Sequence, residues 1–298
     1  MAVNKVQTIC PWACLLLVLL ALNVNAATAQ TADSERQLQI DIFGSGQFSR
    51  FNFTNLTTPY DGVDAYTVVR VAHWWDQGRR IGLFGELNPV FSSPDEFSFQ
   101  RYLQLSGGIQ LYPAGGILKP LRVFAKASRR SHYGAGVGPD VPNADFETGV
   151  DHYYDNLFAP SRWKAISYTT AGFHSTQFSI DRYNAVLWTG SFRAGPSFRP
   201  DSDSMFVPYG LVDWAYAGAD RDRFWENYLR TGAGMRWYPQ MHQGGSFGTS
   251  LAGRFHIFAE AVGNLAWLGN APAGSVPRYD VRLGLGFSTG GIYRYGSR

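Results

Sequence analysis

Apolar and polar residues alternate at every second position along much of this chain, and the pattern is clearest near its C-terminus. Every odd-numbered position from Tyr279 to Phe287 is apolar or aromatic, whereas the even-numbered positions hold Asp280, Arg282, two glycines and Ser288. Side chains of a β-strand point alternately to the two faces of its sheet. The segment is therefore predicted to be a strand with one apolar face and one polar face.

A strand pattern of this kind recurs in eleven segments of the chain. They are residues 37–48, 67–75, 80–88, 102–112, 121–130, 163–174, 184–198, 205–216, 224–238, 253–268 and 278–288. Bacterial outer-membrane barrels close with an even number of strands, so we expect twelve strands, with ten as the alternative. Residues 48–55 and part of 131–162 are the two candidates for the missing strand.

The composition favours a membrane protein over a soluble one. Charged residues are only 16% of the chain and aromatic residues reach 15%, yet the mean hydropathy is −0.18 because apolar residues are dispersed. A soluble domain has roughly 25% charged residues. Within lipid an open sheet edge leaves backbone groups without hydrogen bonds, so the sheet must close. We predict an all-β fold, a transmembrane antiparallel up-and-down β-barrel with lipid outside and polar side chains inside; a secreted soluble β-sandwich is the alternative.

The first 29 residues have the pattern of a secretory signal peptide. A lysine near the start precedes the apolar run 13–22, and small residues follow, so cleavage is expected after Ala26 or Ala29. Both cysteines, Cys10 and Cys14, lie in this segment. The mature barrel, residues 30–298, is then predicted to lack disulfides and thiolate metal sites, and to reside in the bacterial outer membrane.

Two stretches resemble a known family. In residues 102–130 (YLQLSGGIQLYPAGGILKPLRVFAKASRR), a predicted strand and a short turn are followed by a second strand that ends in basic residues. In residues 193–238, a strand that contains Pro-Tyr is followed by an Asp/Arg turn and by a strand with the pattern Gly-x-Gly-x-Arg-Trp. These resemble the C-terminal β-barrel of NfrA-type phage-adsorption and exopolysaccharide-export outer-membrane proteins. Such proteins usually carry a periplasmic helical-repeat region before the barrel, and no such region is predicted from this sequence. The resemblance implies a porin-like barrel connected with surface polysaccharide or phage adsorption.

The polar faces of the predicted strands supply candidate luminal residues. These are Arg70, Arg80, Glu86, Arg122, Lys126, Arg130, Arg230, Arg236, Arg254, His256, Glu260 and Arg282, on faces that also carry Gln104, Gln110, Glu226 and Asp280. Arginine and lysine outnumber the acidic residues in this set by nine to four. We therefore expect a basic lumen, which would attract anionic solutes, or alternatively a narrow barrel filled by Arg–Glu pairs.

A polar segment, residues 131–162, is the candidate for an external recognition loop. Carboxylates stand beside aromatic residues there, and this combination is suited to binding sugars. The candidate residues are Asp140, Asp145, Glu147, Asp151, Tyr153, Tyr154 and Asp155. Calcium ligation would need oxygen ligands at EF-hand-like spacing, which the segment does not have, so no metal is expected. A solvated loop that only caps the barrel is the alternative.

The sequence provides no sign of enzymatic chemistry. It has no Gly-x-Ser-x-Gly nucleophile elbow and no His-x-x-x-His pair. A net charge of +3 does not indicate nucleic-acid binding. We expect a non-enzymatic protein that acts as a structural or binding module or as a channel, with no cofactor. Its expected partners are outer-membrane lipid and either polysaccharide or a periplasmic chain. A lipid-modifying barrel enzyme is the alternative.

Overall fold

The computed structural model describes twelve stretches of the chain. They are residues 38–53, 60–75, 80–93, 101–113, 121–133, 143–157, 159–176, 184–200, 203–218, 227–239, 255–267 and 277–288. The predicted signal peptide, residues 1–29, lies outside these ranges, as do Asp140, Glu226 and Arg254.

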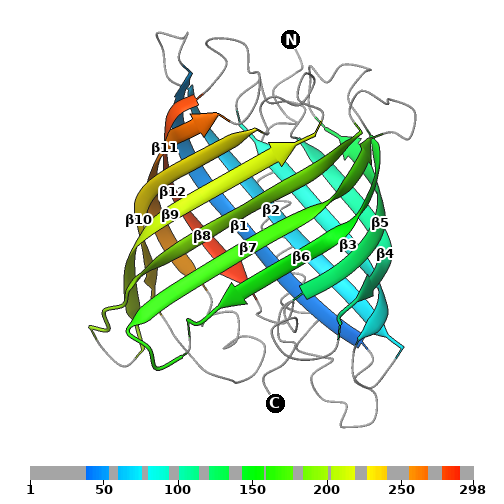
Figure 1. Ribbon diagram of the computed structural model, residues 1–298, viewed down its shortest axis with the longest axis horizontal. Coiled ribbons are helices and arrows are strands. Elements are labelled where there is room, and N and C mark those ends of the chain that lie inside the picture. Colours follow the sequence, from blue (N-terminus) through cyan, green and yellow to red (C-terminus); the bar gives the residue numbers. More distant parts are fainter. Residues whose placement is uncertain are drawn as a thin grey trace, which may run out of the picture.

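Each described stretch contributes one strand to a single closed sheet (Figure 1). The strands are β1 (Leu38–Phe53), β2 (Tyr60–Trp74), β3 (Ile81–Ser92), β4 (Tyr102–Leu111), β5 (Leu121–His132), β6 (Ala144–Asp155), β7 (Trp163–Thr176), β8 (Ala185–Pro196), β9 (Met205–Ala217), β10 (Tyr228–Tyr238), β11 (His256–Trp267) and β12 (Pro277–Ser288). Each strand pairs antiparallel with the next, and β12 pairs with β1 to close the ring. The prediction of a twelve-stranded antiparallel barrel is confirmed.

The twelfth strand, β6, comes from the segment expected to be an external loop. Of the other candidate, residues 48–55, the described part, residues 48–53, forms the end of β1. The sequence analysis placed the carboxylates of residues 145–155 outside the barrel, and this was wrong. They belong to a wall strand that is paired on both sides, with β5 and with β7.

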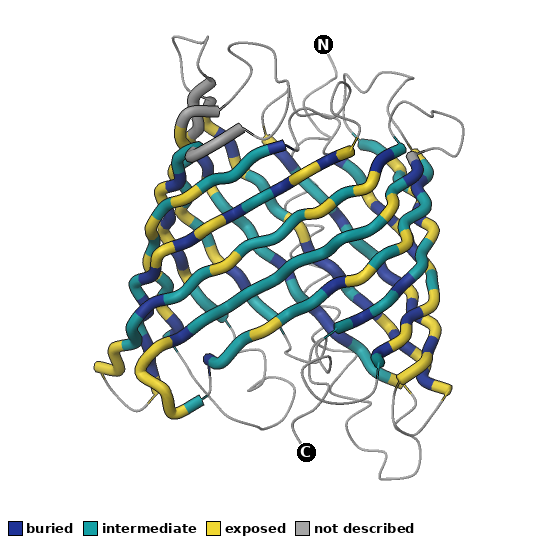
Figure 2. Tube along the Cα trace, in the orientation of Figure 1, coloured by how far each residue is buried: buried dark blue, intermediate teal, exposed yellow. Residues whose placement is uncertain are grey.

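The outer face of the barrel is apolar, as the alternation predicted. Leu105, Leu283 and Ile81 are 64%, 58% and 44% exposed, while the neighbours of Leu105 on the opposite face of β4, Gln104 and Ser106, are buried. Figure 2 shows exposed and buried residues alternating along the strands. In water so many exposed large apolar side chains would be unfavourable, so this surface faces lipid.

Strand length and aromatic placement fit a bilayer. A strand of about 12 residues is about 40 Å long, and at a tilt near 45° it covers about 28 Å of membrane. Exposed aromatic residues lie near both ends of the barrel. Trp75 and Trp163 mark the end where β1 begins and β12 ends, called here the terminal rim, and Trp188 and Tyr279 mark the opposite rim. Aromatic girdles at both interfaces are typical of bacterial outer-membrane barrels, and this is one.

Among the described residues, no helix has the length and apolar character needed to cross a membrane.

Candidate functional site: the lumen

The lumen is the candidate functional site because the wall is a single sheet, so inward side chains meet only each other. Arg70, Glu86, Arg122, Asp151 and Glu260 are all less than one tenth exposed. In a wall one strand thick, such burial requires that other luminal side chains cover them. Charged groups removed from water in this way must be paired.

One group of ion pairs lies on the wall formed by β2 to β6. Arg70 Nε donates to Glu86 Oε1 at 2.6 Å. The Arg122 guanidinium forms a fork with Asp151, with Nε at 3.1 and 3.0 Å from the two carboxylate oxygens. Arg70 and Arg122 both lie over the ring of Phe84, 5.3 and 5.5 Å from its centroid. The guanidinium groups are thus fixed by carboxylates and by an inward aromatic ring.

A second group lies on β5, β6 and β7, closer to the opposite rim. Lys126 Nζ is 3.1 Å from Glu147 Oε2, and Arg130 pairs with Asp145. His174 Nε2 is 3.6 Å from Asp145 Oδ2 and 3.9 Å from Glu147 Oε1. Ligand atoms of Asp145, Glu147 and His174 lie within 4.8 Å of one another. A divalent cation there would stand beside the lysine and the arginine that already compensate both carboxylates, so the geometry is that of an ion-pair network.

The third group, on β8 to β12, extends into the lumen and is centred on Glu260. Arg193 Nε lies 2.9 Å from Glu260 Oε1, and Tyr209 Oη donates to the same oxygen at 2.7 Å. Arg236 and Arg282 approach the same carboxylate at 3.7 and 3.6 Å. Arg193 is on β8 and Glu260 on β11, with β9 and β10 between them in the wall. Their bond can only be made through the interior of the barrel.

Asp213 and Asp280 complete this third group. Asp213 is 3.6 Å from both Arg193 Nη2 and Arg282 Nη1, and Arg282 Nε donates to Asp280 Oδ2 at 2.6 Å. Three arginines therefore face three carboxylates. We call the set Arg193, Asp213, Arg236, Glu260, Asp280 and Arg282 the cross-lumen cluster.

Among the described residues, the ion-paired charges of the lumen are balanced and do not show the basic excess that the sequence analysis predicted. The ion pairs with mostly buried side chains join seven basic residues to seven acidic ones. The basic residues are Arg70, Arg122, Lys126, Arg130, Arg193, Arg236 and Arg282; the acidic ones are Glu86, Asp145, Glu147, Asp151, Asp213, Glu260 and Asp280. The difference arose in part because Asp145, Glu147 and Asp151 were assigned to a loop and Asp213 was not recognised as inward. Arg80 and Arg230 in addition take no part in these ion pairs, and Arg254 and Glu226 lie outside the described residues.

Near the terminal rim the lumen carries apolar clusters on opposite halves of the wall. One cluster consists of Ala72, Trp74, Phe84, Tyr112 and Phe124, from β2 to β5. The other consists of Leu157, Met205, Val207, Tyr209, Leu211, Tyr238 and Val262. On β9 the inward face is thus largely apolar, as is its outward face, which carries Phe206, Val212 and Trp214. These clusters narrow the lumen at this rim.

The remaining predicted luminal residues that the structure describes are Arg80, Arg230 and His256, and Arg230 stands opposite Asp213 of the cross-lumen cluster in the register of β9 and β10. Arg80 is exposed, directly before β3 at the terminal rim. Arg230 is half-buried, with its guanidinium 3.9 Å from the Tyr228 ring centroid. His256, at the start of β11, lies 5.2 Å from the ring of Tyr238.

The predicted loop residues divide between the two faces of β6. Asp145 and Asp151 are buried inside the barrel and Glu147 is half-buried there. Tyr153 and Asp155 share their inward face by alternation, whereas Tyr154 is exposed on the outer face. None of the six described members lies in an external loop.

The sequence analysis did not single out Arg193, Tyr209 and Asp213, which the structure places in or beside the cross-lumen cluster. The alternation along β9 could have located Asp213, because it lies two residues after Leu211 and four after Tyr209 and so shares their face of the strand. It would have placed Asp213 on the inward face only if that apolar face had been recognised as inward.

Comparisons with known proteins do not identify a family. No protein-family model matches the chain, and no curated protein sequence matches it. Solved structures that are similar include the β domain of the Bordetella autotransporter BrkA, with 14% identity over 84% of this chain and 99% of that one and a TM-score of 0.41. The translocator domain of the autotransporter NalP from Neisseria meningitidis covers 93% of this chain and 96% of its own, with 10% identity and a TM-score of 0.35.

A further similar structure is the KdgM porin in complex with disordered oligogalacturonate, with 6% identity over 82% of this chain and 98% of that one and a TM-score of 0.37. The fold of this chain is established by its own closed sheet and apolar exterior, described above.

Proposed function

We propose that this outer-membrane barrel is a non-enzymatic channel with a narrow, charge-balanced lumen that admits polar solutes, saccharide chains above all. The observation that carries the proposal is Tyr66 on β2. It shares the inward face of Arg70 and Trp74 and is nevertheless 44% exposed. The charges of Arg236 and Arg193, on the other side of the ring, act on it. The exposure of this inward side chain shows solvent-accessible space beside Tyr66 within the lumen.

The chemistry of the lining supports saccharides as the solute class. Paired Arg and carboxylate groups present hydrogen-bond donors and acceptors without a net field, so they do not select by charge. Inward aromatic rings such as Tyr66 offer flat faces on which sugar rings can stack. The resemblance of residues 102–130 and 193–238 to exopolysaccharide-export and phage-adsorption barrels points to the same class of ligand.

A second function, a barrel with a self-filled lumen that serves as a structural or binding module, is favoured by the cross-lumen bonds. Arg193 and Glu260 join strands that are not neighbours, and the apolar clusters narrow the terminal rim. In that case surface loops or a periplasmic partner would carry the function.

Planar-bilayer recording of the refolded protein distinguishes the two functions. We expect discrete conductance steps with nearly equal permeability to K⁺ and Cl⁻, and transient block by a neutral oligosaccharide such as maltohexaose. Tyr66→Ala should weaken the block while leaving the ion selectivity unchanged. A membrane that stays silent with both the wild-type protein and the wider Arg193→Ala variant would refute the channel and favour the structural module.

A further inference from the structure

The lipid-facing wall is hollowed at the terminal rim, where the β6–β7 connection approaches the β8–β9 connection. The pocket has a volume of about 1090 Å³ and is lined by residues 159–162, Lys164, residues 197–200, Phe206, Pro208 and Met235. Backbone and side-chain bonds hold the two connections together, because the amide and the hydroxyl of Ser197 both donate to the Arg162 carbonyl, at 2.7 and 3.0 Å. The pocket is therefore a built part of the rim.

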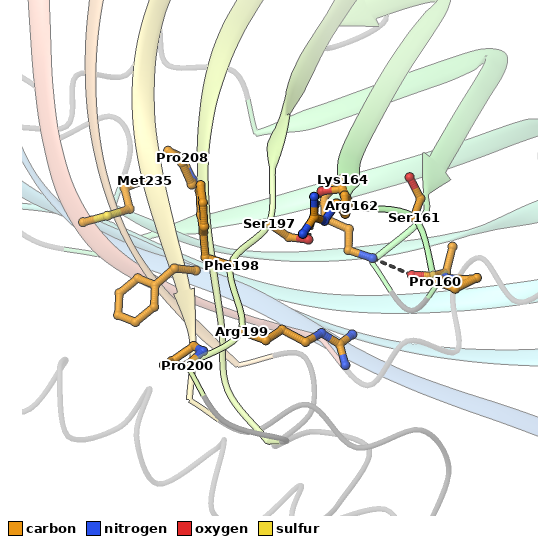
Figure 3. A pocket seen from close by; sticks show the side chains of 12 residues that line it. Pro160, Ser161, Arg162, Lys164, Ser197, Phe198, Arg199, Pro200, Pro208 and Met235 are labelled. Atoms are coloured by element: carbon orange, nitrogen blue, oxygen red, sulfur yellow. Dashed lines mark hydrogen bonds between the residues drawn. The ribbon is translucent and has the colours of Figure 1, made fainter.

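One side of the pocket continues the lipid-facing surface. Phe198 and Met235 are 58% and 49% exposed. Phe198 is fixed by reciprocal backbone bonds of 2.8 Å with Phe206, whose ring stacks on Trp237 at 5.8 Å and 11°. Figure 3 shows Phe198, Pro208 and Met235 together on one side. This side would contact acyl chains.

The other side of the pocket is cationic. Lys164 is 3% exposed and its Nζ donates to the Ala159 carbonyl at 2.6 Å (Figure 3). The charge of Arg199 acts on Lys164, so these like charges are close enough to repel. Arg162 and Arg199 are exposed, and neither has an ion-pair partner among the described residues. None of the lining residues is acidic, and Asp203 of the same β8–β9 connection is exposed outside the pocket.

We propose that this pocket binds an anionic phospholipid from the leaflet at the terminal rim. The lipid phosphate binds Arg162 and Arg199, where its negative charge offsets the repulsion between Arg199 and Lys164, and the acyl chains lie along Phe198, Phe206 and Met235. The pocket opens beside the outer wall, so a lipid reaches it by lateral diffusion in the membrane. A basic cluster beside an apolar, membrane-embedded surface is a recognised arrangement for lipid headgroups. The proposal does not depend on whether the lumen conducts.

Native mass spectrometry of the refolded barrel in detergent tests the site. The probe is phosphatidylglycerol, compared with phosphatidylcholine of the same acyl chains, which carries no net charge. We expect one phosphatidylglycerol to be retained preferentially. In the double variant Arg162→Gln/Arg199→Gln we expect its affinity to fall on the order of tenfold or more, from the loss of two headgroup contacts. Arg129→Gln is the matched control, because Arg129 is an exposed arginine near the opposite rim.

Heat-modifiable migration on gels verifies that each variant is folded. Equal retention of phosphatidylcholine and phosphatidylglycerol by the wild-type protein would overturn the proposal. So would unchanged phosphatidylglycerol binding by the folded double variant. An equal loss in Arg129→Gln would show that the lipid responds to surface charge in general, which also contradicts a specific site.

Discussion

Replacement of Glu260 by glutamine tests whether the cross-lumen cluster is the electrostatic centre of the barrel. The carboxylate is 4% exposed and receives hydrogen bonds from Arg193 and Tyr209, while Arg236 and Arg282 lie within 4 Å. Glutamine has nearly the same shape and keeps one oxygen acceptor. The substitution therefore removes one negative charge and leaves three arginines facing two carboxylates.

The expected cost follows from burial. Loss of one partner from a buried ion pair typically costs about 3–5 kcal/mol, because it leaves an uncompensated buried charge. Since the amide oxygen still accepts a bond from Tyr209 or Arg193, we expect the low end of that range, about 3 kcal/mol. Glu147→Gln is the matched control. The side chain of Glu147 is 25% exposed and pairs with Lys126, so water can compensate and we expect a cost of about 1 kcal/mol or less.

Urea-induced unfolding from phospholipid vesicles, followed by tryptophan fluorescence, measures both free-energy changes. A double-mutant cycle with Arg193→Gln should return a coupling between about 1 and 3 kcal/mol for the Arg193–Glu260 pair. A cost for Glu260→Gln no greater than that for Glu147→Gln, together with zero coupling to Arg193, would refute the electrostatic reasoning.

Two further predictions concern the lipid-facing wall. Leu105→Arg places a charge on a residue that is 64% exposed outside the barrel, and we expect the free energy of unfolding from vesicles to fall by about 2–4 kcal/mol; a neutral result would contradict lipid contact at this position. Spin labels at Ile81, Leu105 and Leu283 should be accessible to oxygen dissolved in lipid and protected from a water-soluble nickel reagent. A label at Tyr66 should show the reverse. Protection of all four labels from both reagents would mean that the apolar side chains pack in a protein interior.

Much of the wall could be predicted because its pattern is local. Alternation with a period of two depends only on the pleat of one strand, so the outward positions of Ile81, Leu105 and Leu283 could be inferred without knowledge of any neighbour. The same pattern failed for β6 because its inward face carries Asp145, Glu147 and Asp151, and a strand so rich in acids has the composition of a loop. For β9 the strand was predicted correctly, but its inward face was not identified, because the inward residues Val207 and Leu211 are apolar like the outward ones.

Partner choice inside the lumen could not be predicted, because it depends on the register and closure of the whole sheet. Arg193 and Glu260 are 67 residues apart in the chain and on strands that do not pair. Their proximity follows only when twelve strands close into a ring and the two side chains reach into the same space. The charge balance of the lumen is a property of the same kind, since each strand supplies only one member of most pairs.

The sequence by itself thus determined a lipid-facing antiparallel barrel, because the alternation of apolar and polar residues is a property of each strand's own sequence. The closed tertiary structure alone decided which charges neutralise one another, where apolar side chains narrow the lumen, and where basic side chains gather beside the lipid-facing wall. The physical reason is that a side chain's electrostatic environment is set by groups brought together across the ring, and their spacing along the chain does not specify it.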